Sequence, residues 1–366
     1  MELTGAKPAR IMSIDALRGF DMLMIIFADR FFYHLGQAAP NPVTETLATH
    51  FNHPEWYGFH FYDIIMPLFL FMVGAVIPYS LHRRVDQGGT RTFYLHLLRR
   101  FAILFFLGWI VQGNLLALDA SKFHIFSNTL QAIAVGYLFA SIIYLNLQKK
   151  WWYLLFALCL VAYAALLAFP TLPGGAQSVI LPGKSFVLYV DQLVFGRFDD
   201  GLEYTWLLTG LGFTATTLSG MFAGELIRSE SDKVKVFKYL ALIGILAVVT
   251  GLVWDIWHPI VKKVWTSSFV LFSSGICYLM LALFYWVIDI KGWQKWAFWL
   301  RVIGMNAIVA YVASHVLNFP DISAYIMFGL EQYTGGFYPV ITSIGGFGLL
   351  YLVLWYMYRK GTFVKV

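Results

Sequence analysis

The chain has 366 residues, of which 59% are hydrophobic, 18% aromatic and only 13% charged. Because a soluble domain carries about 25% charged residues, this composition excludes an ordinary soluble protein and predicts a single polytopic membrane domain over residues 1–366. The formal charge of +6 does not indicate nucleic-acid binding, because the basic residues lie in short clusters between apolar segments, as membrane topology produces.

Apolar segments long enough to cross about 30 Å of hydrocarbon recur along the whole chain. A segment in lipid has to satisfy its own backbone groups, which favours helices, and no strand-like alternation recurs. The sequence therefore predicts an all-α protein with about ten transmembrane helices. The predicted spans are 12–33, 61–81, 101–118, 128–147, 152–169, 205–227, 239–257, 266–289, 300–318 and 339–358.

Lysine and arginine are distributed unevenly between the predicted connections. With a cytoplasmic amino terminus, nineteen lysines and arginines fall on the cytoplasmic side and only six on the outer side, namely Arg30, Lys122, Lys184, Arg197, Lys262 and Lys263. The excess on the other side predicts that both termini are cytoplasmic. The long connections 34–60, 170–204 and 319–338 then face outwards, and loops of this length tend to be functional.

The first predicted span carries an unusual number of charged residues, in SIDALRGFDMLMIIFADR. At about 100° per residue, Asp15, Arg18 and Asp29 fall within an arc of about 60°, so the helix has a polar face. Asp15 and Arg18 are three residues apart, and they either neutralise each other to fix helix packing or take part in function. Asp29 lies near the outer end, where an intramembrane charge typically lines a cavity, so it is a candidate functional residue.

Residues 51–74 read FNHPEWYGFHFYDIIMPLFLFMVG, a polar and aromatic segment that runs directly into the second predicted span. Pro54 favours an extended backbone at His53, and Trp56 suits a membrane–water boundary. Asp63 lies just inside the apolar run, where a carboxylate is costly unless it faces protein or water. We therefore expect the chemistry at this junction.

The predicted cytoplasmic loop His82–Arg100 holds five arginines, Arg83, Arg84, Arg91, Arg99 and Arg100. Such arginines commonly signal topology and contact anionic lipids. The alternative is a docking site for a phosphorylated cytosolic ligand.

We interpret the polar and small residues within the later spans first as residues that pack helices together. Gln131 and Asn306, taken singly, are expected to bond neighbouring helices, and the small residues of Leu208–Gly224 predict close helix packing. The P-loop, HExxH, CxxC and GxSxG signatures do not occur in the sequence, and we expect no metal site.

Seven blocks of the sequence form an ordered series. The first is RIMSIDALRGFDM at Arg10–Met22, and the second is the histidine-containing segment 51–74. The others are LRRFAILFFLG, TLQAIAVGY, DDGLEYTWLLTGLGFTATTLSGMFAGELI, HPIVKKVWTSSFVLFSSG and IGMNAIVAY. Together they resemble the heparan-α-glucosaminide N-acetyltransferase family, transmembrane enzymes that move an acetyl group from acetyl-CoA across a membrane onto a terminal glucosamine. Two positions depart from the family pattern: Asp29 stands where asparagine is usual, and Ala132 where arginine is usual.

The resemblance implies a membrane-embedded acetyl-CoA-dependent N-acetyltransferase, in which His53 is the catalytic histidine and Asp63 the membrane carboxylate that follows it. His53 would act as the general base on an amine or would carry the acetyl group transiently. Asp29 would orient the imidazole or the amine. Acetyl-CoA would enter from the cytoplasm with its phosphates held by arginines. The candidate residues for the CoA site are Arg18, Arg83, Arg84, Arg99, Arg100, Gln131 and Asn306.

The implied acceptor is an amino sugar or glycan on the outer side, and the compact form indicates a bacterial inner (cytoplasmic) membrane. Membrane lipids are the other expected partners, and a homodimer is left open. Two further classes are also left open. One is a secondary transporter for a sugar-type solute that uses Asp15, Asp21, Asp29 and Asp63 as coupling carboxylates. The other is a scaffold or lipid-binding protein without turnover. The His53 motif favours the enzyme.

Overall fold

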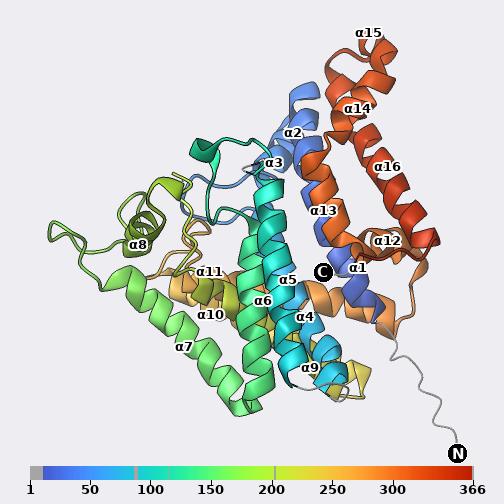
Figure 1. Ribbon diagram of the computed structural model, residues 1–366. Helices are drawn as coiled ribbons and strands as arrows, with labels where there is room; N and C mark the ends of the chain where they lie inside the picture. Colours follow the sequence, from blue (N-terminus) through green and yellow to red (C-terminus); the bar gives the residue numbers. More distant parts are fainter. Residues whose placement is uncertain (1–10, 86–89, 114, 202, 365–366) are drawn as a thin grey trace, which may run out of the picture.

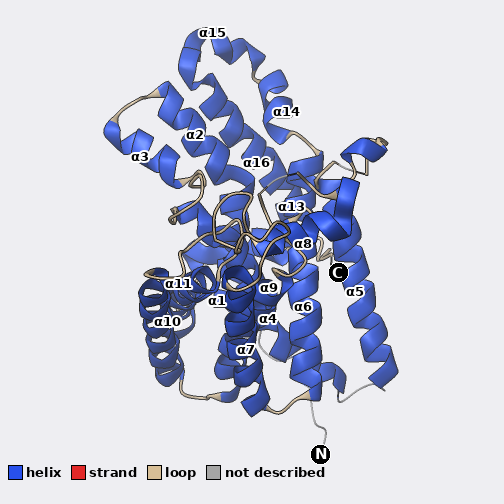
Figure 2. Ribbon diagram, turned by 90° about the vertical axis from the view of Figure 1, so that its left-hand side faces the viewer, coloured by secondary structure: helices blue, strands red, loops and turns tan. Residues whose placement is uncertain are grey.

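The computed structural model describes residues 11–85, 90–113, 115–201 and 203–364, and the side chains of 82–92 lie outside this description. Within these ranges the regular elements are helices, and the only β-type pairing is an isolated bridge between Thr171 and Gln177 (Figure 2). The prediction of an all-α protein is confirmed.

The α-helices follow one another in the order labelled in Figure 1, with π-helical segments at Met24–Ala28 and Trp286–Ile290. They are α1 (Met12–Leu23), α2 (Asp29–Ala38), α3 (Pro42–His50), α4 (Ile65–Val85), α5 (Thr90–Val111), α6 (Thr129–Asn146), α7 (Lys149–Ala168), α8 (Phe186–Phe195), α9 (Gly210–Ser229), α10 (Lys233–Asp255), α11 (Ser267–Tyr285), α12 (Phe298–Met305), α13 (Ala307–Val316), α14 (Phe319–Ile326), α15 (Glu331–Thr334) and α16 (Tyr338–Arg359). Short 3-10 turns lie at Phe61–Ile64, Ala120–Lys122, Gly196–Phe198, Lys295–Ala297, Phe328–Leu330 and Gly335–Phe337.

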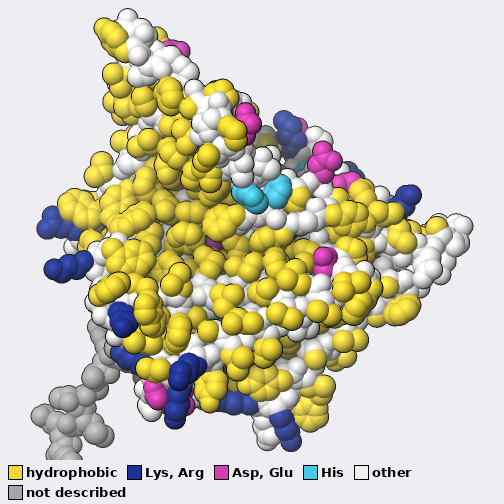
Figure 3. Space-filling model, turned by 180° about the vertical axis from the view of Figure 1, so that it is seen from behind, with side chains coloured by type: hydrophobic (Ala, Val, Ile, Leu, Met, Phe, Trp, Pro, Cys, Tyr) yellow, Lys and Arg dark blue, Asp and Glu magenta, His cyan; other side chains and the backbone are white. Residues whose placement is uncertain are grey.

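Seven helical stretches of the described residues are long and apolar enough to cross a membrane, and an eighth is a pair bent by 65°. The seven are Phe61–Leu81, Phe93–Val111, Thr129–Asn146, Lys149–Ala168, Lys233–Asp255, Ser267–Ile290 and Phe328–Arg359, and the bent pair is Lys295–Met305 with Ala307–Val316. In Figure 3 a broad apolar surface is bordered by lysine and arginine along its lower and left-hand edges. These are the features of a multi-pass integral membrane protein.

Two of the ten predicted spans are helical but do not meet the same measure of length and apolarity. The span 12–33 is divided by the π-helical segment Met24–Ala28. The span 205–227 corresponds to α9, which is rich in glycine, serine and threonine. The described residues therefore support seven or eight spans.

The start of α5 differs from its prediction. The helix begins at Thr90 and ends at Val111, so residues 90–100, which were predicted as part of a cytoplasmic loop, form its first half. Phe93 and Leu97 recur at helical spacing and are buried, while Arg99 is exposed. A long arginine side chain on a membrane helix can extend its charge to water, so the arginines of this segment do not terminate the helix.

Helix α9 is largely buried, and it has small residues where α4 approaches. A Cβ atom added at Gly220 would meet the carbonyl oxygen of Phe71, and one added at Gly74 of α4 would meet the carbonyl oxygen of Thr217. The backbones of α4 and α9 are thus in direct van der Waals contact, as is common between membrane helices. The close packing predicted for Leu208–Gly224 is confirmed.

Two irregular helices border the region of the long loops. Between α1 and α2 the π-helical segment widens the turn, so Asp29 is rotated away from the face that a regular helix would share with Asp15 and Arg18. Between α12 and α13 the helix breaks at Asn306, whose backbone is not helical. Its side chain donates to the carbonyl of Thr362 and accepts from the amide of Val364, at 3.2 and 3.1 Å.

Candidate active site

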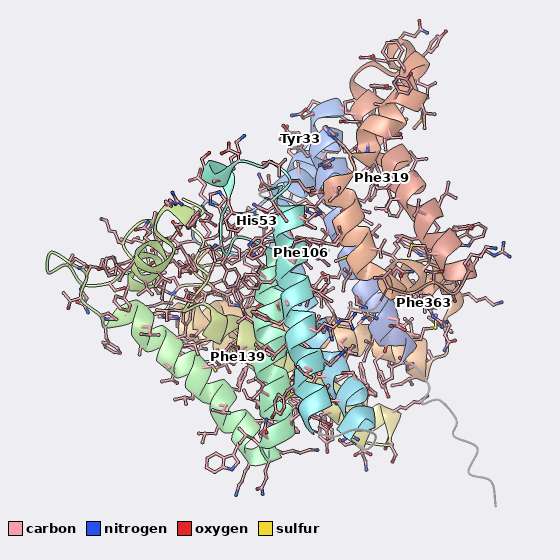
Figure 4. All side chains as sticks on the ribbon, in the orientation of Figure 1. Tyr33, His53, Phe106, Phe139, Phe319 and Phe363 are labelled. Carbon is pink, nitrogen blue, oxygen red and sulfur yellow. The ribbon has the colours of Figure 1, made fainter. Side chains whose placement is uncertain are left out.

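Seven parts of the chain converge on a cavity of about 310 Å³. They are the π-helical segment, the segment around His53 with the start of α4, the end of α5, the start of α6 with the residues before it, the start of α9 with the loop before it, the turn between α10 and α11, and α13. In Figure 4 His53 lies near the upper ends of α5 and α6, at about the level of Phe106. The cavity therefore lies at the end of the bundle that carries the long loops.

The walls of the cavity combine aromatic rings with polar groups. The aromatic members are Tyr62, Tyr204, Trp206, Phe213, Trp265 and Tyr311. The polar and charged members are His53, Gln112, Ser127, Asn128, Thr129, Asp200, Thr205, Lys262, Lys263 and His315. Small-molecule sites typically have this composition, in which rings supply contact area and a few polar groups fix the orientation of the ligand.

His53 and Asp63 are brought together by local structure. The Asn52 side chain accepts a hydrogen bond from the His53 amide at 2.9 Å. Asp63 lies in a 3-10 turn and accepts one from the His60 amide at 2.8 Å. The remaining Asp63 oxygen, Oδ1, lies 2.6 Å from His53 Nδ1. The junction predicted from the sequence is thus a histidine–carboxylate pair.

This pair fixes the tautomer of the imidazole. The Asp63 side chain is fully buried, whereas that of His53 is 34% exposed. An ionised carboxylate can only accept, so Nδ1 carries the proton and Nε2 keeps a free lone pair. Burial lowers the pKa of His53, and the neighbouring Lys262 cation acts in the same direction, while the hydrogen bond to Asp63 opposes both. The net lowering favours the neutral imidazole that a general base requires.

Lys262 is the residue of this site that the sequence interpretation missed. Its Nζ lies 3.3 Å from Asp63 Oδ1 and 3.2 Å from each of His53 Nδ1 and Nε2. Burial lowers the pKa of Lys262 to about 8. The sequence showed Lys262 only as one of six outer basic residues. The signal that could have identified Lys262 is its place in the block HPIVKKVWTSSFVLFSSG, which is one of the seven sequence blocks that form the ordered series.

A strained turn holds Lys262 in place. The Thr266 hydroxyl donates to the Pro259 carbonyl at 2.8 Å and accepts from the Val261 amide at 3.1 Å. Trp265 has a positive φ of 47°, which is rare for a bulky residue. Backbone strain of this kind persists only where the surroundings fix it, and it concentrates at functional sites.

Asp29 does not contact His53 directly. It lies close enough to Tyr62 and to His315 to interact electrostatically with both. The Tyr62 ring in turn lies 5.2 Å from the His53 ring, measured between centroids. The carboxylate that orients the imidazole is therefore Asp63, and Asp29 lies one side chain further away.

The two amides proposed for the CoA site are both bonded within the protein. Gln131 accepts from the Ser127 amide at 2.9 Å and donates to the Ile125 carbonyl at 3.1 Å, which holds the segment that carries Ser127 against the cavity. Asn306 is bonded to the C-terminal segment, as described above. Both contacts correspond to the packing role that is usual for buried amides.

The arginines proposed for CoA lie apart from the cavity. Arg18 pairs with Asp15 at 2.5 Å, Arg99 is exposed, and the Arg100 guanidinium lies 3.9 Å from the centroid of the Tyr137 ring. The side chains of Arg83, Arg84 and Arg91 lie outside the described residues.

Comparison with known proteins gives a distant but almost full-length relationship. Residues 10–115 match the family model described as "Domain of unknown function (DUF5009)". The chain is 22% identical to heparan-alpha-glucosaminide N-acetyltransferase of Homo sapiens over 425 aligned residues, which cover 99% of this chain and 60% of the human protein. It is also 22% identical to the Mus musculus protein of the same name over 418 residues, with 98% and 60% covered. The chain thus spans about 60% of the length of these curated relatives.

Proposed function

We propose that the chain is a membrane-embedded acetyltransferase that passes an acetyl group from cytosolic acetyl-CoA to the amine of an amino sugar or glycan on the outer side. The observation that carries the proposal is the contact of 2.6 Å between His53 Nδ1 and Asp63 at the edge of an aromatic and polar cavity. The names of the distant relatives support the same reaction class.

The histidine–carboxylate pair suits the attack of an amine on a thioester. Only an unprotonated amine attacks, and its nitrogen must lose a proton as the new bond forms. His53 Nε2 has the free lone pair to take that proton, and Asp63 stabilises the imidazolium that results. The same lone pair would also serve a two-step route, in which Nε2 first takes the acetyl group and then passes it to the amine. Direct transfer is the route that we favour.

The cavity suits a sugar ring that bears an amine. Tyr204 and Trp206 supply aromatic faces, and Asp200, Asn128 and Gln112 supply hydrogen-bonding groups beside them. The Trp206 indole donates to Asp200 at 2.9 Å, so the ring and the carboxylate are fixed relative to each other. This arrangement offers a hydroxyl-rich ligand both apolar contact and polar partners.

The donor would reach this cavity along α5 from the opposite end of the bundle. Arg100 precedes the cavity residue Gln112 by twelve positions, which at 1.5 Å per residue is about 18 Å along the helix. Arg18, Arg99 and Arg100 are the described arginines that would bind the anionic phosphates of CoA, and Arg83 and Arg84 remain part of this proposal.

The proposed orientation puts both termini and the α6–α7 connection in the cytoplasm and the cavity outside. Figures 1 and 2 show the α6–α7 connection, which precedes Lys149 and Lys150, at the end away from the long loops. If α1 with α2, α9 and the bent pair α12–α13 each count as one span, the total becomes the ten that the sequence predicts. The proposed location is a bacterial inner membrane.

Binding of the donor can be tested by thermal unfolding of the detergent-purified protein. A ligand at about 100 times its Kd stabilises the native state by about 2.7 kcal/mol, so acetyl-CoA at that concentration is expected to raise Tm by at least about 2 °C. An unrelated nucleotide is expected to leave Tm unchanged, and free CoA to raise it, because the phosphates supply most of the binding. An unchanged Tm at saturating acetyl-CoA would contradict the proposal and favour the transporter class.

A further inference from the structure

The position of the Lys262 ammonium relative to the His53 ring is unusual. Nζ is 3.2 Å from both ring nitrogens. A point in the ring plane at this distance from both would collide with Cε1, which lies between them. The ammonium therefore lies over the face of the ring, and the Nε2 lone pair in the ring plane stays free.

Lys262 is held as a cation. Its side chain is 9% exposed and lies 3.3 Å from the fully buried Asp63 carboxylate. Because a buried charge requires a partner, Asp63 and Lys262 stabilise each other's ionised forms. A charged ammonium has no lone pair, so Lys262 is neither the general base nor a nucleophile. Acetylation of its Nζ would also give a stable amide and end the reaction.

The Lys262 ammonium beside the His53 ring can contribute to the proposed acetyl transfer, and this inference rests on that proposed function. The carbon that is attacked must lie close to Nε2, because Nε2 takes the proton from the attacking nitrogen. The carbonyl oxygen lies one bond from that carbon, within reach of an ammonium that is 3.2 Å from Nε2. Fixed positive charge beside a developing oxyanion is commonly the largest single contribution to catalysis of acyl transfer.

We propose that Lys262 is the catalytic residue that stabilises the oxyanion of the acetyl-transfer transition state. The amine nitrogen forms a bond to the thioester carbon, and the carbonyl π electrons move to the oxygen beside Lys262 Nζ. His53 Nε2 takes the proton from the nitrogen. When the carbon–sulfur bond breaks, its electron pair leaves with sulfur, and the CoA thiolate takes the proton from Nε2. The two-step route through acetyl-His53 would use the same oxyanion site.

Substitution separates this role from a purely structural one. Lys262→Met is expected to lower kcat by about 10²- to 10³-fold with a small change in KM for acetyl-CoA, because the cation acts on the transition state. Lys262→Arg is expected to recover part of kcat. Lys122→Met is the control, since Lys122 is an outer lysine with a 70% exposed side chain, and it should retain full activity. An active Lys262→Met enzyme with unchanged kcat would overturn the role of Lys262 and leave the proposed function standing.

The pH profile of the unmodified enzyme gives a second test that needs no variant. Lys262 is charged below its pKa of about 8, so kcat/KM is expected to fall as the pH rises through about 8. His53 is neutral only above its own lowered pKa, so the rate also falls at low pH. The charged and titratable groups that face these two residues are Asp63 and His60, with Tyr62, Asp200, Tyr204, Lys263 and His315 on the cavity walls.

The two limbs of that profile should respond differently to Lys262→Met. The alkaline limb is expected to disappear, and the acid limb to move to higher pH, because the cation that lowers the pKa of His53 is gone. A purely structural lysine would lower Tm and leave both limbs in place. An alkaline limb absent from the unmodified enzyme would contradict the proposal, as would one that persists in Lys262→Met. If the unmodified protein transfers no acetyl group, the proposed function fails, and the role of Lys262 fails with it.

Discussion

Replacing His53 by asparagine is expected to lower kcat/KM for acetyl transfer by about 10³-fold or more. Nε2 is the group placed to take the proton from the attacking amine, and asparagine has no basic nitrogen. Since the His53 side chain is 34% exposed and lies in a loop, the variant should fold with a Tm close to that of the unmodified protein. The measurements are initial rates of CoA release with acceptor present and the melting curve.

His50→Asn is a suitable control for the His53 variant. His50 ends α3 and lies on the exposed surface, and we assign it no part in the reaction. The His50 variant should keep full activity, so that loss in the His53 variant cannot be ascribed to histidine removal in general. A His53→Asn protein that retains kcat/KM within a factor of about ten would rule out His53 as the base or acetyl carrier. An acetyl group found on His53 when acceptor is omitted would favour the two-step route.

The second large effect is expected for Asp63→Asn. Asp63 is a positioning residue, because it acts through His53 and does not touch the substrate. An asparagine amide group facing Nδ1 would favour the other tautomer, with Nε2 protonated and unable to accept, and in a histidine–aspartate pair of a hydrolase this change lowers kcat by about 10⁴-fold. We expect a loss of about 10³- to 10⁴-fold in kcat here, measured at saturating acetyl-CoA.

The same substitution should also destabilise the fold, because it leaves the buried Lys262 ammonium without its carboxylate. Removing one member of a buried ion pair costs about 3–5 kcal/mol. The double variant Asp63→Asn/Lys262→Met should recover much of that stability and none of the activity. If the double variant is as unstable as Asp63→Asn alone, the ion pair is not the source of the loss. Full activity in Asp63→Asn would show that the tautomer is set by another group.

The sequence predicted the His53–Asp63 junction because the information is local. The proline after the histidine, the aromatic residues and the carboxylate ten positions later lie within one segment, and a single 3-10 turn joins them. Lys262 could not be predicted in this way, since it reaches the site from a turn 209 residues away. The place of the turn that carries Lys262 depends on how α11 packs against α4 and α9, and this follows from tertiary contacts.

The accuracy of the predicted helix boundaries also depended on whether the signal for each boundary is local in the sequence. The apolar length of most spans was visible in the sequence, so their positions agree within a few residues. At α5 the arginines were interpreted as marking a loop, whereas the structure continues the helix through them. The π-helical segment after α1 was also not predicted, because its sequence MIIFA has no residue that distinguishes a wide turn from a regular one. Asp29 directly follows this segment and lies beside Tyr62.

The measurement that tests the central claim most directly is the stoichiometry of acetyl transfer by the purified protein in proteoliposomes. Acetyl-CoA is supplied with a glucosamine oligosaccharide that has a free terminal amine, and free CoA thiol and N-acetylated product are counted by mass spectrometry. The expected result is one N-acetyl product for each thiol released, with both lost together in His53→Asn. Release of thiol without product, or product formed equally by His53→Asn, would contradict acetyl transfer at this site.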